Sequence, residues 1–324
     1  MALNSHAQLF EWGIGFHGFV DNREYAESGR FSQTITGLRI APRIGFLVDS
    51  THRIQVGASL LSGFGTQSFI DQADPIIYYQ YHKPTVDFYM GMIPREETIG
   101  RFSNALLNDT MAYSDPNMGG ILVHYHHGKV QQRLWLDWES APGIDKREQF
   151  RVGAKGSVRW KHFYLEHQMM LWHYALAQNS NPDQHIRDNL ALQVMAGYQR
   201  SSANFIDSLE VSGGVLFSLD RIRNVYDWST PLGGVVHLYA KHKSLFVENE
   251  LYIGEEQDIP NGVNFYMEKT YNRLDLGWAP LRNARLNAAL IFRFHFTPTG
   301  MDNQQVLSLR YRIGNRFPLR FSAD

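Results

Sequence analysis

The feature that most constrains this chain is a series of short runs in which apolar and polar residues alternate with a period of two. Residues 9–20 set the pattern, because one parity is apolar and the other mixes small and polar groups. The apolar parity reads Phe10, Trp12, Ile14, Phe16, Gly18 and Val20. Successive side chains of a β-strand point to opposite faces, so such a run predicts a strand with one apolar and one polar face.

The pattern recurs about sixteen times, with an uncertainty of about two from errors at the run boundaries. The connections alternate in length, which predicts antiparallel neighbours with tight turns at one end and loops at the other. The long connections follow the odd-numbered runs and are residues 21–32, 63–74, 94–119, 140–148, 174–188, 220–233, 255–264 and 297–303.

Sixteen strands enclose more volume than side chains can fill. The polar parity is rich in Arg, Glu, Gly, Ser and His, which suits a wet lumen, so the apolar parity has to face lipid. In hydrocarbon an open sheet edge would leave backbone groups unpaired, so the sheet has to close. We therefore predict an all-β fold, a closed antiparallel transmembrane β-barrel of about 16 strands (about 14–18) that takes residues 8–324 as one domain. A soluble propeller would need a repeat of about 40 residues, and none is found.

Composition removes several other classes of protein. Cysteine is absent, which excludes disulfides, thiolate metal sites and cysteine nucleophiles. With 31 basic and 32 acidic residues the net charge is −1, so we expect no nucleic-acid partner. The motif Gly13-x-Gly15-x-x-Gly18 matches the dinucleotide fingerprint in letters only, because it lies inside an alternating run and no helix follows it. We expect no cofactor.

Residues 1–7 precede the first run. Ser5-His6-Ala7 before Gln8 reads like the small-x-small end of a signal-peptidase site, although the charged and apolar regions of a signal peptide are missing. We expect these seven residues to be the remnant of a signal peptide, or residues added to the mature chain.

At this level the chain resembles the Gram-negative outer-membrane porins. The resemblance rests on about sixteen amphipathic strands, alternating connection lengths, a signal-like start and a longest connection that is third in order. The last run also resembles the terminal strand of that family, although the chain continues from Pro318 to Asp324; its shared parity is Leu307, Leu309, Tyr311, Ile313 and Phe317. The resemblance implies export through a cleaved signal peptide to the cell outer membrane. It also implies contact with the lipid bilayer and lipopolysaccharide, and assembly as a homotrimer or a larger outer-membrane complex.

The longest connection, 94–119, carries both charge signs and a helix-like stretch, NALLNDTM. In porins the loop at this place folds into the lumen and narrows the channel, so the resemblance implies a constriction here. Its charged residues would be Arg95, Glu96, Glu97, Arg101, Asp109 and Asp115. The alternative is an ordinary surface loop, which contacts a partner subunit.

Closing the barrel makes the first two runs neighbours of the last two. Their polar parity then lines the lumen with five arginines, namely Arg39, Arg43, Arg293, Arg310 and Arg312. Guanidinium groups gathered in a cavity would create a positive field that attracts anions. The alternative is that they pair with acidic residues and only stabilise the wall.

Histidines suggest two further kinds of site. His124 and His126 share a face and could bind a metal, but the sequence assigns no third ligand, so no metal site is predicted. His167 and His173 lie on the apolar parity of one run, where an outer-membrane lipid hydrolase would carry catalytic groups. No serine partner, G-x-S-x-G or H-E-x-x-H motif accompanies them. We predict no catalytic residue and expect that the protein is not an enzyme.

The leading hypothesis is a porin for passive diffusion of small hydrophilic solutes, including ions, with a third-loop constriction and a weak anion preference. One alternative is a plugged barrel that serves as a subunit of an outer-membrane complex. The other is an outer-membrane lipid hydrolase. The pattern assigns no particular solute.

Overall fold

The computed structural model of the chain describes residues 8–201 and 206–318. Residues 1–7, where a signal-peptide remnant is expected, lie outside the described residues. No helix in the described part of the chain is long and apolar enough to cross a membrane.

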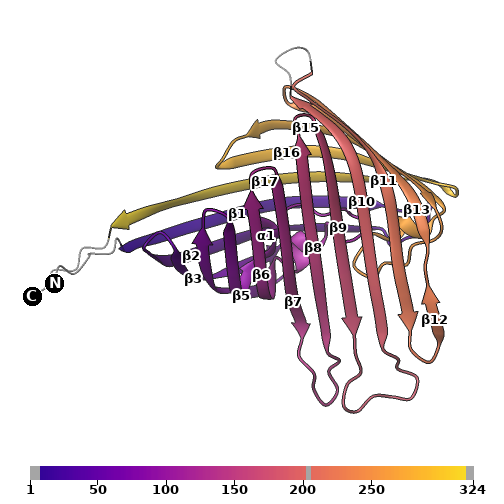
Figure 1. The fold of residues 1–324 in the computed structure, drawn as a ribbon, viewed down its shortest axis with the longest axis horizontal. Helices are drawn as coiled ribbons and strands as arrows, with labels where there is room; N and C mark the ends of the chain where they lie inside the picture. The colour runs from indigo at the N-terminus through magenta and orange to yellow at the C-terminus, as the bar shows by residue number, and fades with distance from the viewer. Residues whose placement is uncertain (1–7, 202–205, 319–324) are drawn as a thin grey trace, which may run out of the picture.

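The described residues form seventeen antiparallel strands (Figure 1). Their bounds are β1 (Gln8–Glu24), β2 (Gln33–Val48), β3 (His52–Gly63), β4 (Gln72–Lys83), β5 (Val86–Pro94), β6 (Asn117–His127), β7 (Val130–Ser140), β8 (Gln149–Trp160), β9 (Phe163–Tyr174), β10 (Arg187–Ser201), β11 (Ser208–Ile222), β12 (Tyr226–Ser229), β13 (Leu232–His242), β14 (Leu245–Gly254), β15 (Thr270–Arg282), β16 (Leu286–Thr297) and β17 (Gly300–Pro318).

The sheet is closed, because β1 pairs with both β2 and β17. The short strand β12 meets only the end of β11, while β11 pairs directly with β13 along its length. Leaving out β12, sixteen of the seventeen strands form the ring. The predicted all-β, closed antiparallel barrel of about sixteen strands is confirmed.

The connections define two ends, which we call the turn end and the loop end. Tight turns join β2 to β3, β4 to β5 and β6 to β7, and longer segments leave β1, β3 and β5 at the opposite end. One expected long connection is wrong: residues 297–303 do not form a loop, because Thr297 pairs directly with Gly300 in a tight hairpin. The residues after Gly300 are polar, yet they continue β17 as a strand beside the equally polar end of β1.

The two faces of the wall differ as the alternation predicts. The outward parity is apolar and exposed, as at Ile54, Phe46 and Trp160. The inward parity holds buried polar groups such as Arg151, Asp275 and Gln304. Transferring the outward side chains from water to lipid stabilises the barrel in a membrane, since each buried methylene contributes about 0.8 kcal/mol.

Candidate functional site

The connection between β5 and β6, residues 95–116, lies inside the barrel and is called the lumenal loop below. β5 has only nine residues against seventeen in β1, so the chain leaves the wall well below the loop end. The helix α1 (Arg95–Ile99) begins directly after Pro94, and the backbone N–H of Arg95 donates to the carbonyl of Pro116, closing the base of the loop. The predicted folding of the third long connection into the lumen is confirmed.

The helix-like stretch NALLNDTM does not form a continuous helix. Residues 104–107 form turns, and the helices of the loop are α1 and the single turn α2 (Met111–Ser114). The side chains of Ser103 and Asn108 accept hydrogen bonds from the backbone N–H groups of Ala105 and Thr110, and such local bonds compete with an α-helix.

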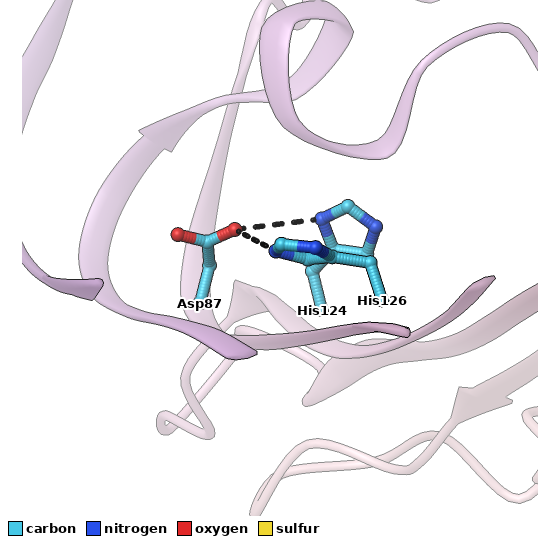
Figure 2. Close-up of side chains that lie close together, drawn as sticks. All are labelled: Asp87, His124 and His126. Atoms are coloured by element: carbon cyan, nitrogen blue, oxygen red, sulfur yellow. Dashed lines mark hydrogen bonds and ion pairs between the residues drawn. The ribbon is translucent and has the colours of Figure 1, made fainter. Parts of the chain in front are cut away.

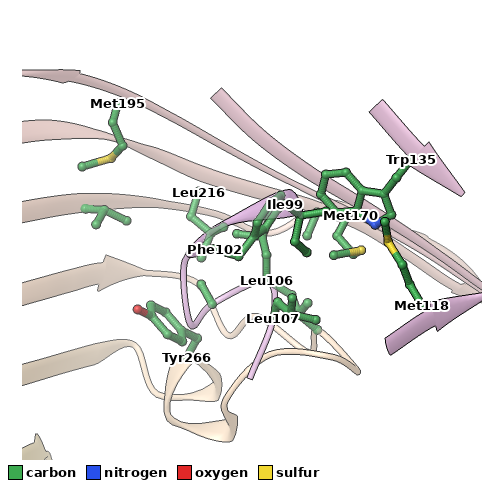
Figure 3. Close-up of a cluster of buried hydrophobic side chains, with 14 of the residues drawn as sticks. Ile99, Phe102, Leu106, Leu107, Met118, Trp135, Met170, Met195, Leu216 and Tyr266 are labelled. Carbon is green, nitrogen blue, oxygen red and sulfur yellow. The ribbon is translucent and has the colours of Figure 1, made fainter. Parts of the chain in front are cut away.

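An apolar cluster anchors the lumenal loop to the wall (Figure 3). Ile99, Leu106 and Phe102 are buried, and the ring of Phe102 meets Trp135 of β7 edge to face at 4.9 Å. Each such side chain contributes about 1.5–3 kcal/mol when it is fully removed from water. The interior of this barrel therefore contains a packed core instead of water alone.

The five predicted wall arginines all contact the lumenal loop. Arg293 binds Asp109 at 2.7 Å, and Arg39 donates to the carbonyl of Tyr113 at 2.5 Å. Near the turn end of the lumen Arg310 pairs with Glu96, and both Arg43 and Arg312 pair with Glu97. The structure thus brings the wall arginines together with three of the six predicted loop charges, and these ion pairs neutralise much of the positive field expected of the wall.

The other three predicted loop charges meet different parts of the wall. Arg95 lies 2.7 Å from Asp137 of β7 and also binds Asp115, whose carboxylate lies 2.9 Å from Arg151 of β8. Arg101 makes a bidentate pair with Glu248 of β14. Ion pairs therefore hold the loop to strands on all sides. That these eleven residues bound a solute pathway stays a prediction.

A second connection, residues 255–269, also enters the lumen from the loop end and includes the 3₁₀ turn η1 (Asn264–Met267). It binds the lumenal loop through two backbone hydrogen bonds, from Asn108 to Asn261 at 2.6 Å and from Val263 to Asn104 at 2.8 Å. Phe265 and Tyr266 are buried beside it. From the sequence this segment was expected only as a long connection, although its NGVNFYM apolar stretch inside a loop was the available signal.

Asp109 of the lumenal loop is held by two arginines of the wall. Its two carboxylate oxygens bind Arg293 at 2.7 Å and Arg23 at 3.1 Å. Burial alone would raise the pKa of Asp109, but the two guanidinium groups outweigh it and hold that pKa well below its usual range. Asp109 is therefore charged and paired at neutral pH.

Among the described residues, two cavities lie between the lumenal loop and the turn end. One, of about 500 Å³, is bounded by the loop and by strands β14–β17. The other, of about 550 Å³, lies on the far side of Arg101 against strands β8–β15 and is more polar, with Lys155, Glu166 and Glu210 in its wall. Each is large enough for a small hydrophilic molecule.

A second arrangement lies on the outer face, at the loop end of strands β7–β11. One row of residues runs around the wall in register, namely Trp138, Phe150, His173, Asp188 and Arg221. The next row toward the turn end is wholly apolar, with Leu136, Val152, Leu171, Leu190 and Leu219. The first row therefore marks the border where the apolar band of the barrel ends. Together with Arg223 we call these residues the rim cluster.

Polar contacts tie the rim cluster together. Nδ1 of His173 lies 2.7 Å from Oδ1 of Asp188, and Arg221 and Arg223 each donate to Oδ2 of Asp188 at 2.8 Å. Phe150 packs against the imidazole at 5.0 Å between ring centres. Within the described residues Nε2 of His173 has no hydrogen-bond partner, and the side chain is 21% exposed.

The second outward histidine of β9, His167, has a different environment. Its Nε2 lies 3.0 Å from Oε1 of Gln132, and no carboxylate of the described chain pairs with it. The sequence pattern placed both histidines on the lipid-facing parity. It did not show the partner of His173, because Asp188 lies fifteen residues away, on the neighbouring strand.

The fold shows the class of protein to which the chain belongs, a closed β-barrel of the outer-membrane type. Similar solved structures include a loop L8 deletion mutant of the outer-membrane protein OmpT of Vibrio cholerae, at 9% identity and a TM-score of 0.59, covering 94% of this chain and 99% of that one. Pseudomonas aeruginosa OccK2 in complex with glucuronate is similar at 9% identity and a TM-score of 0.54, with 94% of this chain and 96% of that one covered. Salmonella typhi OmpF in complex with daunomycin is similar at 12% identity and a TM-score of 0.51, with 94% of this chain and 97% of that one covered. At these identities the likeness is one of fold, and at that level the resemblance to the porins is confirmed.

The family follows from the sequence. The model of the family described as Lipid A 3'-O-deacylase-type matches residues 4–315, and the chain belongs to this family. A comparison with curated proteins found no match. The expectation that the protein is not an enzyme is wrong, because its family is a family of enzymes. That expectation rested on the absence of serine-hydrolase and metalloprotease motifs, which bears only on those two mechanisms.

Proposed function

We propose that this chain is an outer-membrane ester hydrolase that removes an ester-linked acyl chain from lipid A, the reaction for which its family is named. The observation that carries the proposal is the His173–Asp188 pair on the lipid-facing rim. A location in the outer membrane is supported by the fold, the family and the exposed apolar outer face.

The position of the rim cluster suits a lipid substrate. The ester groups of a membrane lipid lie where the hydrocarbon ends, and the rim cluster lies where the apolar band of the barrel ends. Trp138 beside it is exposed on the outer face, as aromatic residues at a membrane border are. An acyl chain would lie against the apolar wall next to Leu171 and Leu190 while its ester reaches His173.

In the proposed reaction His173 is the general base. Asp188 accepts from Nδ1 of His173 and so fixes the ring and its tautomer, which leaves Nε2 to take a proton from water. The water oxygen then bonds to the acyl carbon, the ester C–O bond breaks, and Nε2 returns the proton to the departing sugar oxygen. The products are a free fatty acid and a sugar hydroxyl.

The two arginines supply positive charge for the same reaction. Arg221 and Arg223 each use part of their guanidinium on Asp188 and keep other N–H donors free for an anionic oxygen, either a lipid phosphate or the developing oxyanion. The face of Trp228, 4.3 Å from Arg221, holds that guanidinium near the rim.

The test is acyl release by the purified barrel in phosphatidylcholine vesicles that contain lipid A. Mass spectrometry should show free fatty acid together with lipid A one acyl chain lighter, formed in proportion to enzyme. A folded barrel that leaves lipid A unchanged in these vesicles would contradict the proposal.

A second candidate function, slow passage of small hydrophilic solutes, is favoured by the two cavities on the turn side of the lumenal loop. Single-channel conductance in a planar bilayer tests this function. A folded barrel that conducts no current would exclude it. Reversal potentials in a salt gradient test the weak anion preference, which the pairing of the wall arginines with Glu96, Glu97 and Asp109 should reduce.

A further inference from the structure

Two histidines and an aspartate converge in the lumen near the turn end of β5 and β6 (Figure 2). Asp87 is the second residue of β5, and the register pairs it directly with His124 of β6. His126 lies two residues further along the same face, so its imidazole reaches the same space. Antiparallel pairing thus supplies the third group that sequence spacing alone does not assign.

The distances match those between ligands of one metal ion. Nε2 of His126 lies 3.2 Å and Nδ1 of His124 3.6 Å from Oδ2 of Asp87. Metal–nitrogen and metal–oxygen bonds of about 2.0–2.2 Å place two ligand atoms of a tetrahedral site about 3.3–3.6 Å apart. All three ligand atoms lie within 4.8 Å of one another, so small side-chain rotations would bring them around one ion.

The surrounding groups prepare the carboxylate for this role. Oδ1 of Asp87 is engaged by Nδ1 of His82 at 2.5 Å and by Gln80 at 3.5 Å, while Oδ2 faces the two histidines. Such outer hydrogen bonds are typical of carboxylates and histidines that hold metals. Neither nitrogen of His124 makes a hydrogen bond within the described residues, and its Nε2 is buried.

We propose that Asp87, His124 and His126 form a binding site for a divalent transition-metal ion of the kind that prefers imidazole, with Zn²⁺ as its representative. Imidazole with one carboxylate suits zinc, copper and nickel better than magnesium or calcium, which prefer oxygen ligands. Three protein ligands leave a fourth position open to the lumen, as in sites whose metal exchanges or binds a further ligand. The site lies at the opposite end of the barrel from the rim cluster and does not depend on the proposed hydrolase activity.

One neighbouring charge opposes the ion. Arg133 of β7 pairs in register with His124, and its positive charge adds repulsion to a bound cation. Glu166 and Tyr89 also lie near this guanidinium. We therefore expect an affinity below that of closed structural zinc sites with four ligands, and we expect Arg133→Gln to strengthen zinc binding.

The test is isothermal titration of ZnCl₂ into the folded full-length barrel, purified without a histidine tag. We expect one ion per barrel, with affinity reduced by more than about 100-fold in His124→Gln/His126→Gln and by about 10- to 100-fold in the outer-contact variant His82→Gln. His127→Gln, next along the strand on the other parity, is the matched control and should bind as the wild type does. Far-ultraviolet circular dichroism verifies folding of each variant.

Cobalt substitution gives a second readout that does not depend on affinity. Co²⁺ bound by two imidazoles and a carboxylate should show visible ligand-field absorption in the wild type and in His127→Gln, and lose it in the double variant. A wild-type barrel without stoichiometric zinc binding, or a double variant that binds zinc equally well, overturns the proposal.

Discussion

Asp109 of the lumenal loop and Arg293 of β16, separated by 184 positions in the chain, form an ion pair of 2.7 Å inside the barrel. Arg293 is simultaneously held by Asp275 of β15, and Asp109 by Arg23 of β1. The pair connects the loop to the part of the wall where the barrel closes. A substitution at Asp109 therefore tests whether this pair holds the loop in place.

Asp109→Asn should loosen the lumenal loop. The amide keeps a hydrogen bond but loses the charge, which leaves Arg23 with one acidic partner and weakens docking by about 1–2 kcal/mol because the site is partly exposed. Hydrogen exchange of peptides covering 104–113 should then accelerate about tenfold. Asp145→Asn, an exposed acid in the connection after β7, is the control and should leave that exchange unchanged.

Docking of the lumenal loop should also depend on pH with a definite sign. Because the folded pKa of Asp109 lies below its unfolded value of about 3.9, its contribution is complete above that value and is lost as the pH falls through the folded pKa. Conductance across a planar bilayer should therefore stay flat from pH 8 to about pH 5 and rise only below about pH 4. A rise between pH 8 and pH 6 would mean that another group controls the loop.

Gly262→Ala should separate the two connections that meet in the lumen. A methyl group at Gly262 would lie 2.1 Å from the carbonyl oxygen of Ala105, so the backbones have to move apart at a cost of about 1–3 kcal/mol. Exchange of the amides of Asn108 and Val263, which donate across this contact, should accelerate. Gly213→Ala is the matched control, since its nearest neighbour would lie at 3.9 Å. If the amides of Asn108 and Val263 exchanged at the same rate in Gly262→Ala and Gly213→Ala, the close packing of the two connections would be contradicted.

Gly153→Ala should destabilise the wall. The indole of Trp135 lies over Gly153, and an added Cβ would be 1.9 Å from the ring. Trp135 is buried against Phe102 and has little room to retreat, so we expect a loss of about 1–3 kcal/mol in urea unfolding of the barrel in detergent. Combining the change with Phe102→Ala should recover part of that loss, whereas strictly additive effects would show that the indole does not move toward the loop.

Alternation was sufficient to predict the strands and their faces, because burial and lipid contact act on every second residue. The inward position of the lumenal loop was expected only from the resemblance to the porins. Alternation could not predict which residues meet across neighbouring strands. The pairs His173–Asp188 and Asp87–His124 depend on register, and a shift of one residue would turn each partner to the other face. Alternation also gave a wrong prediction at 297–303. A long connection was expected there, but polar residues continue a strand beyond the apolar band.

The most direct test of the account compares the second-order rate constant of fatty-acid release from lipid A vesicles among wild type, His173→Gln and His167→Gln. Both substitutions remove an outward imidazole from β9, but only His173 has a carboxylate partner within the described residues. We expect His173→Gln to lower kcat/KM by about 100- to 10,000-fold and His167→Gln to stay close to wild type. An active His173→Gln barrel, or equal losses in the two variants, would contradict this expectation.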